Sequence, residues 1–73
     1  MLHFSGKKVC VILCKHFGFS IISQKGSHIK LRKIVDGEKI TVIVPNHYEL
    51  AVGTLRSVLR QARVELEEFL LNK

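Results

Sequence analysis

Histidine is the residue type in this sequence best suited to acid–base chemistry, and two of the four histidines lie near possible phosphate-binding groups. His28 is close in sequence to Lys25, Ser27 and Lys30, and His47 follows nineteen positions later. An imidazole ordinarily changes charge near neutral pH, so a pair of histidines can carry protons to and from a reacting phosphate. Nearby ammonium groups can stabilise the charge that develops on its oxygens. The alternative is that both histidines only contact solvent or cap a loop.

Patterns for other kinds of catalysis are missing from the sequence. There is no nucleophile elbow, no Gly-rich phosphate loop before a helix and no cluster of metal-binding carboxylates. Cys10, Cys14 and His16 match no common zinc-ligand spacing, and two cysteines four apart on a helix form a poor disulfide. We therefore expect free, buried thiols in a reducing cytoplasm, with no metal and no cofactor.

The charge of the chain indicates its class of partner. Twelve Lys and Arg residues face six Asp and Glu residues among 73, a net charge of +6. Residues 1–63 contain eleven of the basic and three of the acidic residues, a net +8. Such a basic body favours a polyanion, with nucleic acid ahead of a membrane, although a merely soluble basic domain is the alternative. Five aromatic residues and no Trp argue against a broad base-stacking platform.

Two long helices and one short helix are predicted from capping residues and apolar periodicity. Ser5 can cap a first helix that runs through Phe17 and ends at Gly18. Its core stripe consists of Val9, Ile12, Leu13 and His16. Thr54 can cap a second helix, which carries a basic stripe of Arg56, Arg60 and Arg63 opposite its apolar side. Residues 65–71 form the short third helix, with three side chains directed inward: Leu66, Phe69 and Leu70.

Three strands are predicted between these helices, at residues 19–24, 28–35 and 39–45. Lys25-Gly26-Ser27 reads as a three-residue hairpin loop, and Asp36-Gly37 as a two-residue turn. If Asp36-Gly37 is the turn of the second hairpin, the two residue numbers of each facing pair sum to 73. This register separates two faces. The apolar face consists of Ile29, Leu31, Val42 and Val44, and the basic face contains His28, Lys30 and Arg32. If pairing continued past the end of this hairpin, His28 and His47 would be diagonal neighbours, roughly 7–8 Å apart.

The order of elements predicts an α+β fold. One domain of the order α-β-β-β-α-α is expected over residues 1–73, since a chain of this length has room for a single core. Both longer helices must cover the one apolar face of a three-stranded antiparallel sheet, which makes a two-layer sandwich. No signal peptide or membrane span is seen, so we expect a cytoplasmic protein that is not in a membrane.

A series of short motifs resembles a known family. In chain order they are Gly18-Phe19, Gln24-Lys25-Gly26-Ser27-His28, Val44-Pro45-x-His47 and Gly53-Thr54-Leu55-x-x-x-Leu59. Joined at these intervals, they resemble the HicA toxins of bacterial HicA–HicB toxin–antitoxin systems, also called the YcfA-like family. The resemblance covers about residues 6–62. Family members often carry a basic residue where this chain has Asn46, and many have a shorter tail than residues 65–73.

The resemblance implies a double-stranded-RNA-binding-domain-like fold and an mRNA-cleaving endoribonuclease, an mRNA interferase. Because RNA carries its own nucleophile, the 2′-hydroxyl, we expect this cleavage to be metal-independent. The resemblance also implies that cleavage depends on the histidine of Gly-Ser-His, here His28, and that the partner is a HicB-like antitoxin. Because the site of an active ribonuclease must be blocked in its own cell, we expect this partner to cover the His28 face, and docking on the acidic third helix is the alternative. Our reading of the residues adds His47 as a second acid or base and Lys25, Ser27 and Lys30 as phosphate support. The groups expected to hold the RNA backbone are Lys7, Lys8, Arg32, Arg56, Arg60 and Arg63. The alternatives are a non-catalytic double-stranded RNA-binding module and a pure interaction subunit.

Overall fold

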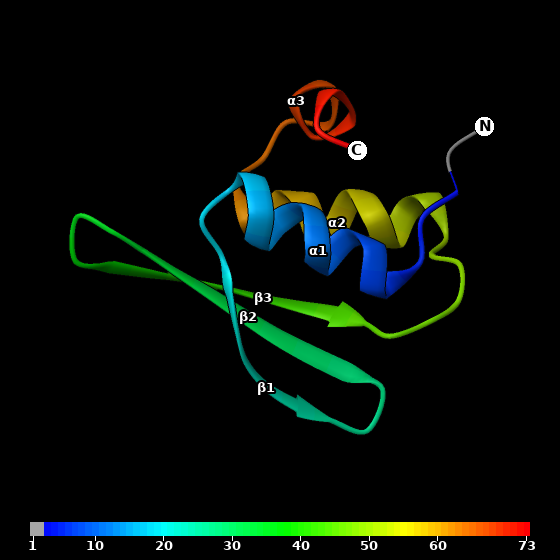
Figure 1. Ribbon diagram of the computed structural model, residues 1–73, viewed down its shortest axis with the longest axis horizontal. Coiled ribbons are helices and arrows are strands. Elements are labelled where there is room, and N and C mark those ends of the chain that lie inside the picture. The colour runs from blue at the N-terminus through cyan, green and yellow to red at the C-terminus, as the bar shows by residue number, and fades with distance from the viewer. Residues whose placement is uncertain (1–2) are drawn as a thin grey trace.

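Three helices and a three-stranded sheet make up the part of the chain that the computed structural model describes, residues 3–73 (Figure 1). In chain order they are α1 (Gly6–His16), β1 (Ser20–Lys25), β2 (His28–Val35), β3 (Glu38–Pro45), α2 (Val52–Ala62) and α3 (Leu66–Leu71). The α+β class and the element order predicted from the sequence are confirmed. None of the described helices is long and apolar enough to cross a bilayer.

The first helix begins and ends where its capping residues predict. The side chain of Ser5 accepts a hydrogen bond from the backbone N–H of Lys8 at 3.0 Å, and Gly18 has a φ of 77° directly after the C-cap, Phe17. The predicted core stripe is correct for Val9, Ile12 and Leu13 and wrong for His16, which is exposed. His16 lies in the last turn of α1, where a polar ring keeps its contact with water and suits the negative end of the helix dipole.

Sheet pairing follows the predicted register over the whole second hairpin. The strand order is β1-β2-β3, and every β2–β3 pair from His28–Pro45 to Val35–Glu38 sums to 73. The first hairpin differs from the prediction, because Lys25 pairs with His28 and leaves a two-residue turn, Gly26-Ser27. Gly26 has a φ of 59°, as its place in the turn requires. A bulge between Ile21 and Ser23 shifts the register farther along β1.

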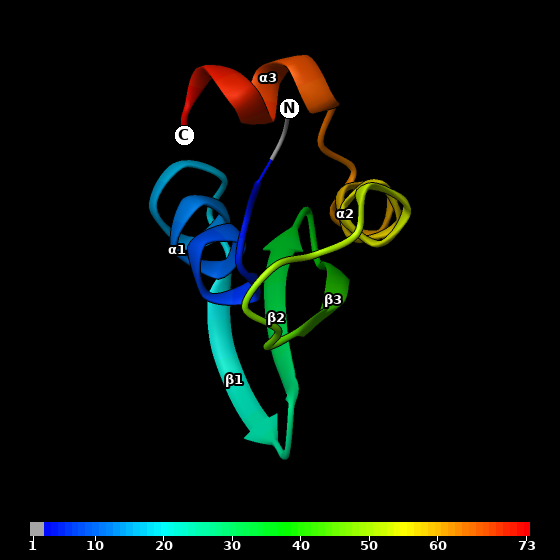
Figure 2. The same cartoon turned by 90° about the vertical axis from the view of Figure 1, so that its right-hand side faces the viewer.

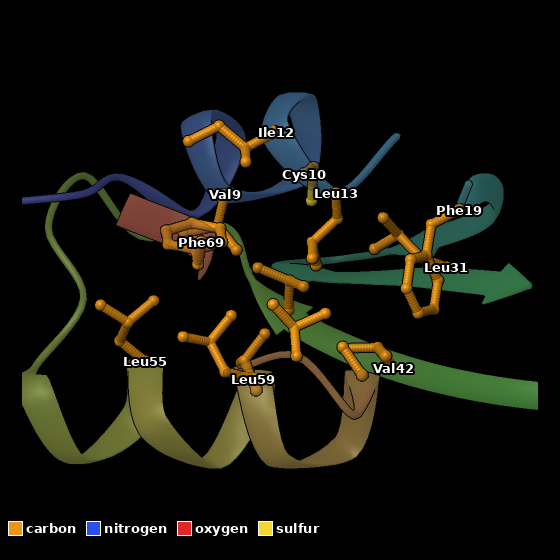
Figure 3. Packing of buried hydrophobic residues seen from close by; sticks show 14 of the residues in the cluster. Val9, Cys10, Ile12, Leu13, Phe19, Leu31, Val42, Leu55, Leu59 and Phe69 are labelled. Atoms are coloured by element: carbon orange, nitrogen blue, oxygen red, sulfur yellow. The ribbon is translucent and has the colours of Figure 1, made fainter. Parts of the chain in front are cut away.

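Helices α1 and α2 lie over one face of the sheet, and α3 lies across the far side of those two helices (Figures 1 and 2). The four residues predicted for the apolar sheet face are all buried: Ile29, Leu31, Val42 and Val44. They pack with the inner sides of the helices, as Figure 3 shows for Leu31, Val42 and Leu59. Phe69 of α3 completes this core, with its ring centroid 5.3 Å from that of Phe4. Among the described residues, no helix lies against the other sheet face.

The second helix starts earlier than its sequence predicts. Ala51 is the N-cap and makes no side-chain hydrogen bond, so the prediction of Thr54 as the cap is wrong. Ala51 has an extended backbone, and its carbonyl accepts the first helical hydrogen bond from Leu55 at 2.9 Å. At the other end of α2, the side-chain oxygen of Gln61 accepts a hydrogen bond from the backbone N–H of Ile43 at 3.1 Å. This bond satisfies a donor on the outer edge of β3 and fixes α2 against that strand.

Candidate active site

His28 is the first residue of the central strand, and pairing with the strands on both sides fixes the position of its backbone. It pairs with Lys25 of β1 and with Pro45 of β3. Its neighbour Ile29 is buried under the helices, and alternation along the strand therefore directs His28 to the open face. The His28 side chain is exposed there. A rigid backbone with an exposed imidazole suits a residue that exchanges protons with a bound substrate.

The phosphate-support residues predicted around His28 lie close to it. Lys25 sits directly across from His28, so their side chains share the open face at the cross-strand spacing of about 5 Å between Cβ atoms. Lys30 lies two residues farther along β2 on the same face, and Ser27 belongs to the turn before His28. The next residue on this face is Arg32, whose Nε donates to Thr41 Oγ1 at 3.3 Å. The open face is therefore positively charged along the first half of β2.

His47 does not extend the strand pairing that would place it diagonally from His28. Pairing ends at Pro45, and the carbonyl of His47 instead accepts a hydrogen bond from the backbone N–H of Gly6 at 2.9 Å. The chain stays near the site for one more residue, because the N–H of Asn46 donates to the carbonyl of Ser27 at 2.6 Å. His47 is exposed, and the hydrogen bond of the preceding residue, Asn46, rather than sheet pairing, keeps it beside the Gly26-Ser27 turn.

The start of α1 packs tightly against the same end of the sheet. Gly6 is buried, and a Cβ at this position would overlap the carbonyl oxygen of Pro45, the residue that pairs with His28. This contact brings the exposed Lys7 and Lys8 to the Pro45 end of the sheet. The close approach of Gly6 was not predicted, and its only signal in the sequence is a glycine directly after a capping serine.

One of the three residues of the basic stripe predicted on α2 is paired with a carboxylate in the structure. Arg56, Arg60 and Arg63 are all exposed and line a hollow of about 550 Å³ between α2 and the start of α3. Arg63 lies just beyond the helix, with a φ of 59°, and both of its terminal nitrogens bind the carboxylate of Glu38, at 2.8 and 3.1 Å. These hydrogen bonds hold the pKa of Glu38 below its usual value.

The Arg63–Glu38 pair lies at the opposite end of the sheet from His28. Glu38 pairs with Val35, seven residues along β2 from His28, which is about 23 Å at 3.3 Å per residue. The predicted RNA-binding residues thus form two groups. Arg32 shares the open sheet face with His28, whereas Lys7, Lys8, Arg56 and Arg60 lie on the helices that cover the other face.

The cysteines are free thiols, with Cys10 buried and Cys14 half-buried. Burial and the neighbouring Cys14 raise the pKa of Cys10 to about 11, which keeps this thiol protonated and unreactive at neutral pH. Among residues 3–73, no three His, Cys, Asp or Glu side chains are grouped so that they could hold a metal ion.

Comparison with known families adds to this geometry. A family model described as the HicA toxin of bacterial toxin–antitoxin systems matches residues 6–64. The chain belongs to the HicA toxin family. The matched segment runs from the first residue of α1 to just past α2, and it contains His28, His47 and the close contact of Gly6 with Pro45. A search of curated proteins found no significant match.

Membership of the HicA family makes this chain the toxin component of a toxin–antitoxin pair.

One exposed residue beside the site was not predicted from the sequence. Tyr48 follows His47 directly, and it is the only Tyr in a chain without Trp. A tyrosine placed between a candidate catalytic histidine and the charged Glu49 was the available signal.

Proposed function

We propose that this HicA-family toxin is a metal-independent endoribonuclease that cleaves mRNA, with His28 as its catalytic residue. The observation that carries the proposal is the position of His28: an exposed imidazole on a backbone held by two neighbouring strands, with Lys25 and Lys30 on the same face. Membership of the HicA family supports the same activity, since the resemblance to these toxins implies an mRNA-cleaving ribonuclease.

RNA supplies its own nucleophile, so the protein needs only proton carriers and charge stabilisation. The bond from the 2′-oxygen to phosphorus forms while the bond from phosphorus to the 5′-oxygen breaks. One proton leaves the 2′-hydroxyl and one reaches the 5′-oxygen, which leaves a 2′,3′-cyclic phosphate and a 5′-hydroxyl. His28 carries one of these protons, and His47 is our candidate for the other, because the Asn46–Ser27 hydrogen bond keeps it beside the turn.

Charge stabilisation falls to the lysines on the open face. Lys25 and Lys30 flank His28, and their ammonium groups can approach the non-bridging oxygens of a phosphate placed over the imidazole. Ser27 lies in the turn that precedes His28 and can donate its hydroxyl to the same phosphate. Arg32 extends the positive surface along β2 and holds the next phosphate of the strand.

The direct test is cleavage of a defined RNA by the purified chain in the presence of EDTA. We expect products with cyclic phosphate and 5′-hydroxyl ends, and we expect a single 2′-deoxy substitution at the cleavage site to block the reaction. Loss of cleavage on chelation with rescue by a divalent metal would contradict the metal-independent route. RNA binding without any cleavage would favour the alternative, a non-catalytic RNA-binding module.

RNA affinity is expected to fall steeply with salt, because each Lys or Arg contact to phosphate releases counterions. Arg56→Ala and Arg60→Ala should weaken binding to unrelated RNAs equally, and each should reduce the slope of log affinity against log salt by about 0.7 for a single strand. Arg63→Ala is the matched control, since Glu38 already occupies its guanidinium, and its effect should be smaller. A change in sequence preference with an unchanged slope would contradict a backbone-binding role.

The partner antitoxin, which we propose to be HicB-like, is expected to cover the open face. A surface that carries Lys25, Lys30 and Arg32 favours an acidic partner, and such a partner competes with RNA for the same groups. We therefore expect labelled RNA bound to His28→Ala protein to be displaced by the antitoxin. A stable complex of RNA, toxin and antitoxin would instead place the partner elsewhere, for example on α3, which has Glu67 and Glu68 in its first turn and is separated from the sheet by α1 and α2.

A further inference from the structure

The loop between β3 and α2, residues 46–51, presents one aromatic side chain to solvent beside the candidate site. Tyr48 is 95% exposed, more than any other large apolar or aromatic side chain of the described residues. We propose that Tyr48 is a base-binding residue, on which one nucleobase of the RNA substrate stacks near the scissile phosphate. This inference rests on the proposed RNA-cleaving function and adds to it a specific contact with the substrate.

Backbone hydrogen bonds hold the loop that carries Tyr48, both before and after this residue. Before it, the carbonyl of His47 accepts from the N–H of Gly6 at 2.9 Å, and after it the N–H of Leu50 donates to the carbonyl of Phe4 at 2.8 Å. The carboxylate of Glu49 lies 3.1 Å from Nδ1 of His3, and Leu50 is buried. An exposed ring on a fixed backbone loses little conformational freedom when a base stacks on it, which favours binding.

The position of Tyr48 along the chain places it near His28. Asn46 is hydrogen-bonded to the carbonyl of Ser27, the residue before His28, and Tyr48 is two residues after Asn46. Two Cα steps span at most about 7.6 Å. A base on Tyr48 therefore belongs to a nucleotide within a few positions of one whose phosphate lies over His28.

A hollow beside Tyr48 has room and charge for part of a nucleotide. Its volume is about 330 Å³, and its lining residues are His3, Phe4, Ser5, Lys8, Tyr48 and Glu49. Lys8 also lines the hollow, and its ammonium group can hold the phosphate of the nucleotide whose base lies on the ring. The hollow lies at the Pro45 end of the sheet, where α1 begins, so an RNA strand bound there connects the open sheet face with the lysines of α1.

A single aromatic residue contributes a limited binding energy, and its chemistry determines which ligand it can bind. Every base has a π-face, so stacking on one ring is tolerant of sequence. The chain has too few aromatic residues for a stacking platform, but one ring beside the scissile phosphate is enough to position one base. The expected ligand is thus an unpaired nucleotide rather than a continuous duplex, whose bases are not free to stack on a side chain.

Tyrosine fluorescence provides a direct test, because Tyr48 is the only Tyr and no Trp is present. A single-stranded RNA is titrated into His28→Ala protein, and the tyrosine emission is recorded beside the anisotropy of a labelled copy of the RNA. N-acetyltyrosinamide titrated with the same RNA corrects for absorption of light by the bases. We expect quenching beyond this control, with the same midpoint as the anisotropy change.

Substitutions measure the contribution of the ring. Tyr48→Ala and Tyr48→Leu should each lower RNA affinity about 5- to 150-fold, the range that corresponds to about 1–3 kcal/mol for one stacked base. Tyr48→Phe should stay within about twofold of the parent, since it keeps the ring. The matched control is Leu71→Ala on α3, which removes a similarly exposed apolar side chain, 85% exposed, from a helix that does not line the hollow beside Tyr48. Thermal melting of each variant should be unchanged.

The outcomes separate this inference from the function on which it rests. RNA binding with quenching and ring-dependent affinity supports both. RNA binding without quenching, or with equal affinity of Tyr48→Ala and the parent, overturns the stacking role while leaving the ribonuclease proposal intact, and it would point to a protein partner for Tyr48. No RNA binding by any variant overturns both.

Discussion

RNA cleavage is expected to fall by a factor of about 10²–10⁴ when His28 is replaced by alanine, the usual contribution of a general acid or base. The fold should survive the change. His28 is exposed on the open sheet face, so its removal leaves no cavity, and such a surface substitution usually changes the free energy of unfolding by less than about 0.5 kcal/mol. RNA binding should persist, because Lys25, Lys30 and Arg32 keep their positions on the paired strands.

The matched control for this experiment is His16→Ala. His16 is also an exposed histidine, but it lies in the last turn of α1, whereas the candidate site lies at the end of the sheet where α1 begins. Cleavage rates, circular dichroism and RNA affinity should be measured for both variants. Full cleavage by a folded His28→Ala protein would contradict the assignment of His28, and equal losses in the two variants would point to a general effect of histidine removal.

Replacing Gly6 with alanine is expected to destabilise the protein by about 1–3 kcal/mol, a typical cost of overpacking. The new Cβ would overlap the carbonyl oxygen of Pro45, which is backbone and cannot rotate away. Either α1 or the end of β3 must shift. The midpoint of thermal unfolding should fall by about 4–8 °C for each kcal/mol in a chain of this size. Because Pro45 pairs with His28, cleavage by the folded fraction should fall as well.

Gly53→Ala provides the control for Gly6→Ala. Gly53 is also a helical glycine, in the first turn of α2, but a Cβ there would meet nothing within 4 Å. Alanine favours a helix over glycine, so Gly53→Ala should be neutral or more stable by up to about 1 kcal/mol. The free energies of unfolding of the two variants should be compared by denaturant unfolding. A Gly6→Ala protein as stable as Gly53→Ala would show that the contact between α1 and β3 relaxes without cost.

Local patterns in the sequence were sufficient for most of the fold. Asp36-Gly37 adopts the positive φ angles of a two-residue hairpin turn, 50° and 80°, and this turn sets the register of β2 and β3. The alternation of apolar residues on both strands agrees with only that register, because a slip of one residue would move the whole apolar set to the open face. The position of His28 on that face was therefore predictable without any tertiary contact.

Errors arose where a residue had two competing roles. Thr54 looked like a helix cap, yet α2 begins at Val52, because the extended backbone at Ala51 supplies the first helical acceptor. Arg63 continued a helical stripe in sequence, but the chain leaves the helix there and Glu38 binds its guanidinium. Both outcomes depend on how the end of one element meets a neighbouring element.

The sequence by itself determined the order of the elements, the register of the second hairpin and the exposure of His28, because each depends on turn chemistry and on short-range periodicity. The tertiary structure alone decided that Gly6 lies against Pro45 and that the carbonyl of His47 accepts a hydrogen bond from the start of α1. It also decided that Tyr48 is exposed on a loop held by backbone hydrogen bonds. These features depend on contacts between residues some forty positions apart. The packing of α1 onto the end of the sheet creates those contacts, and no local pattern in the chain encodes them.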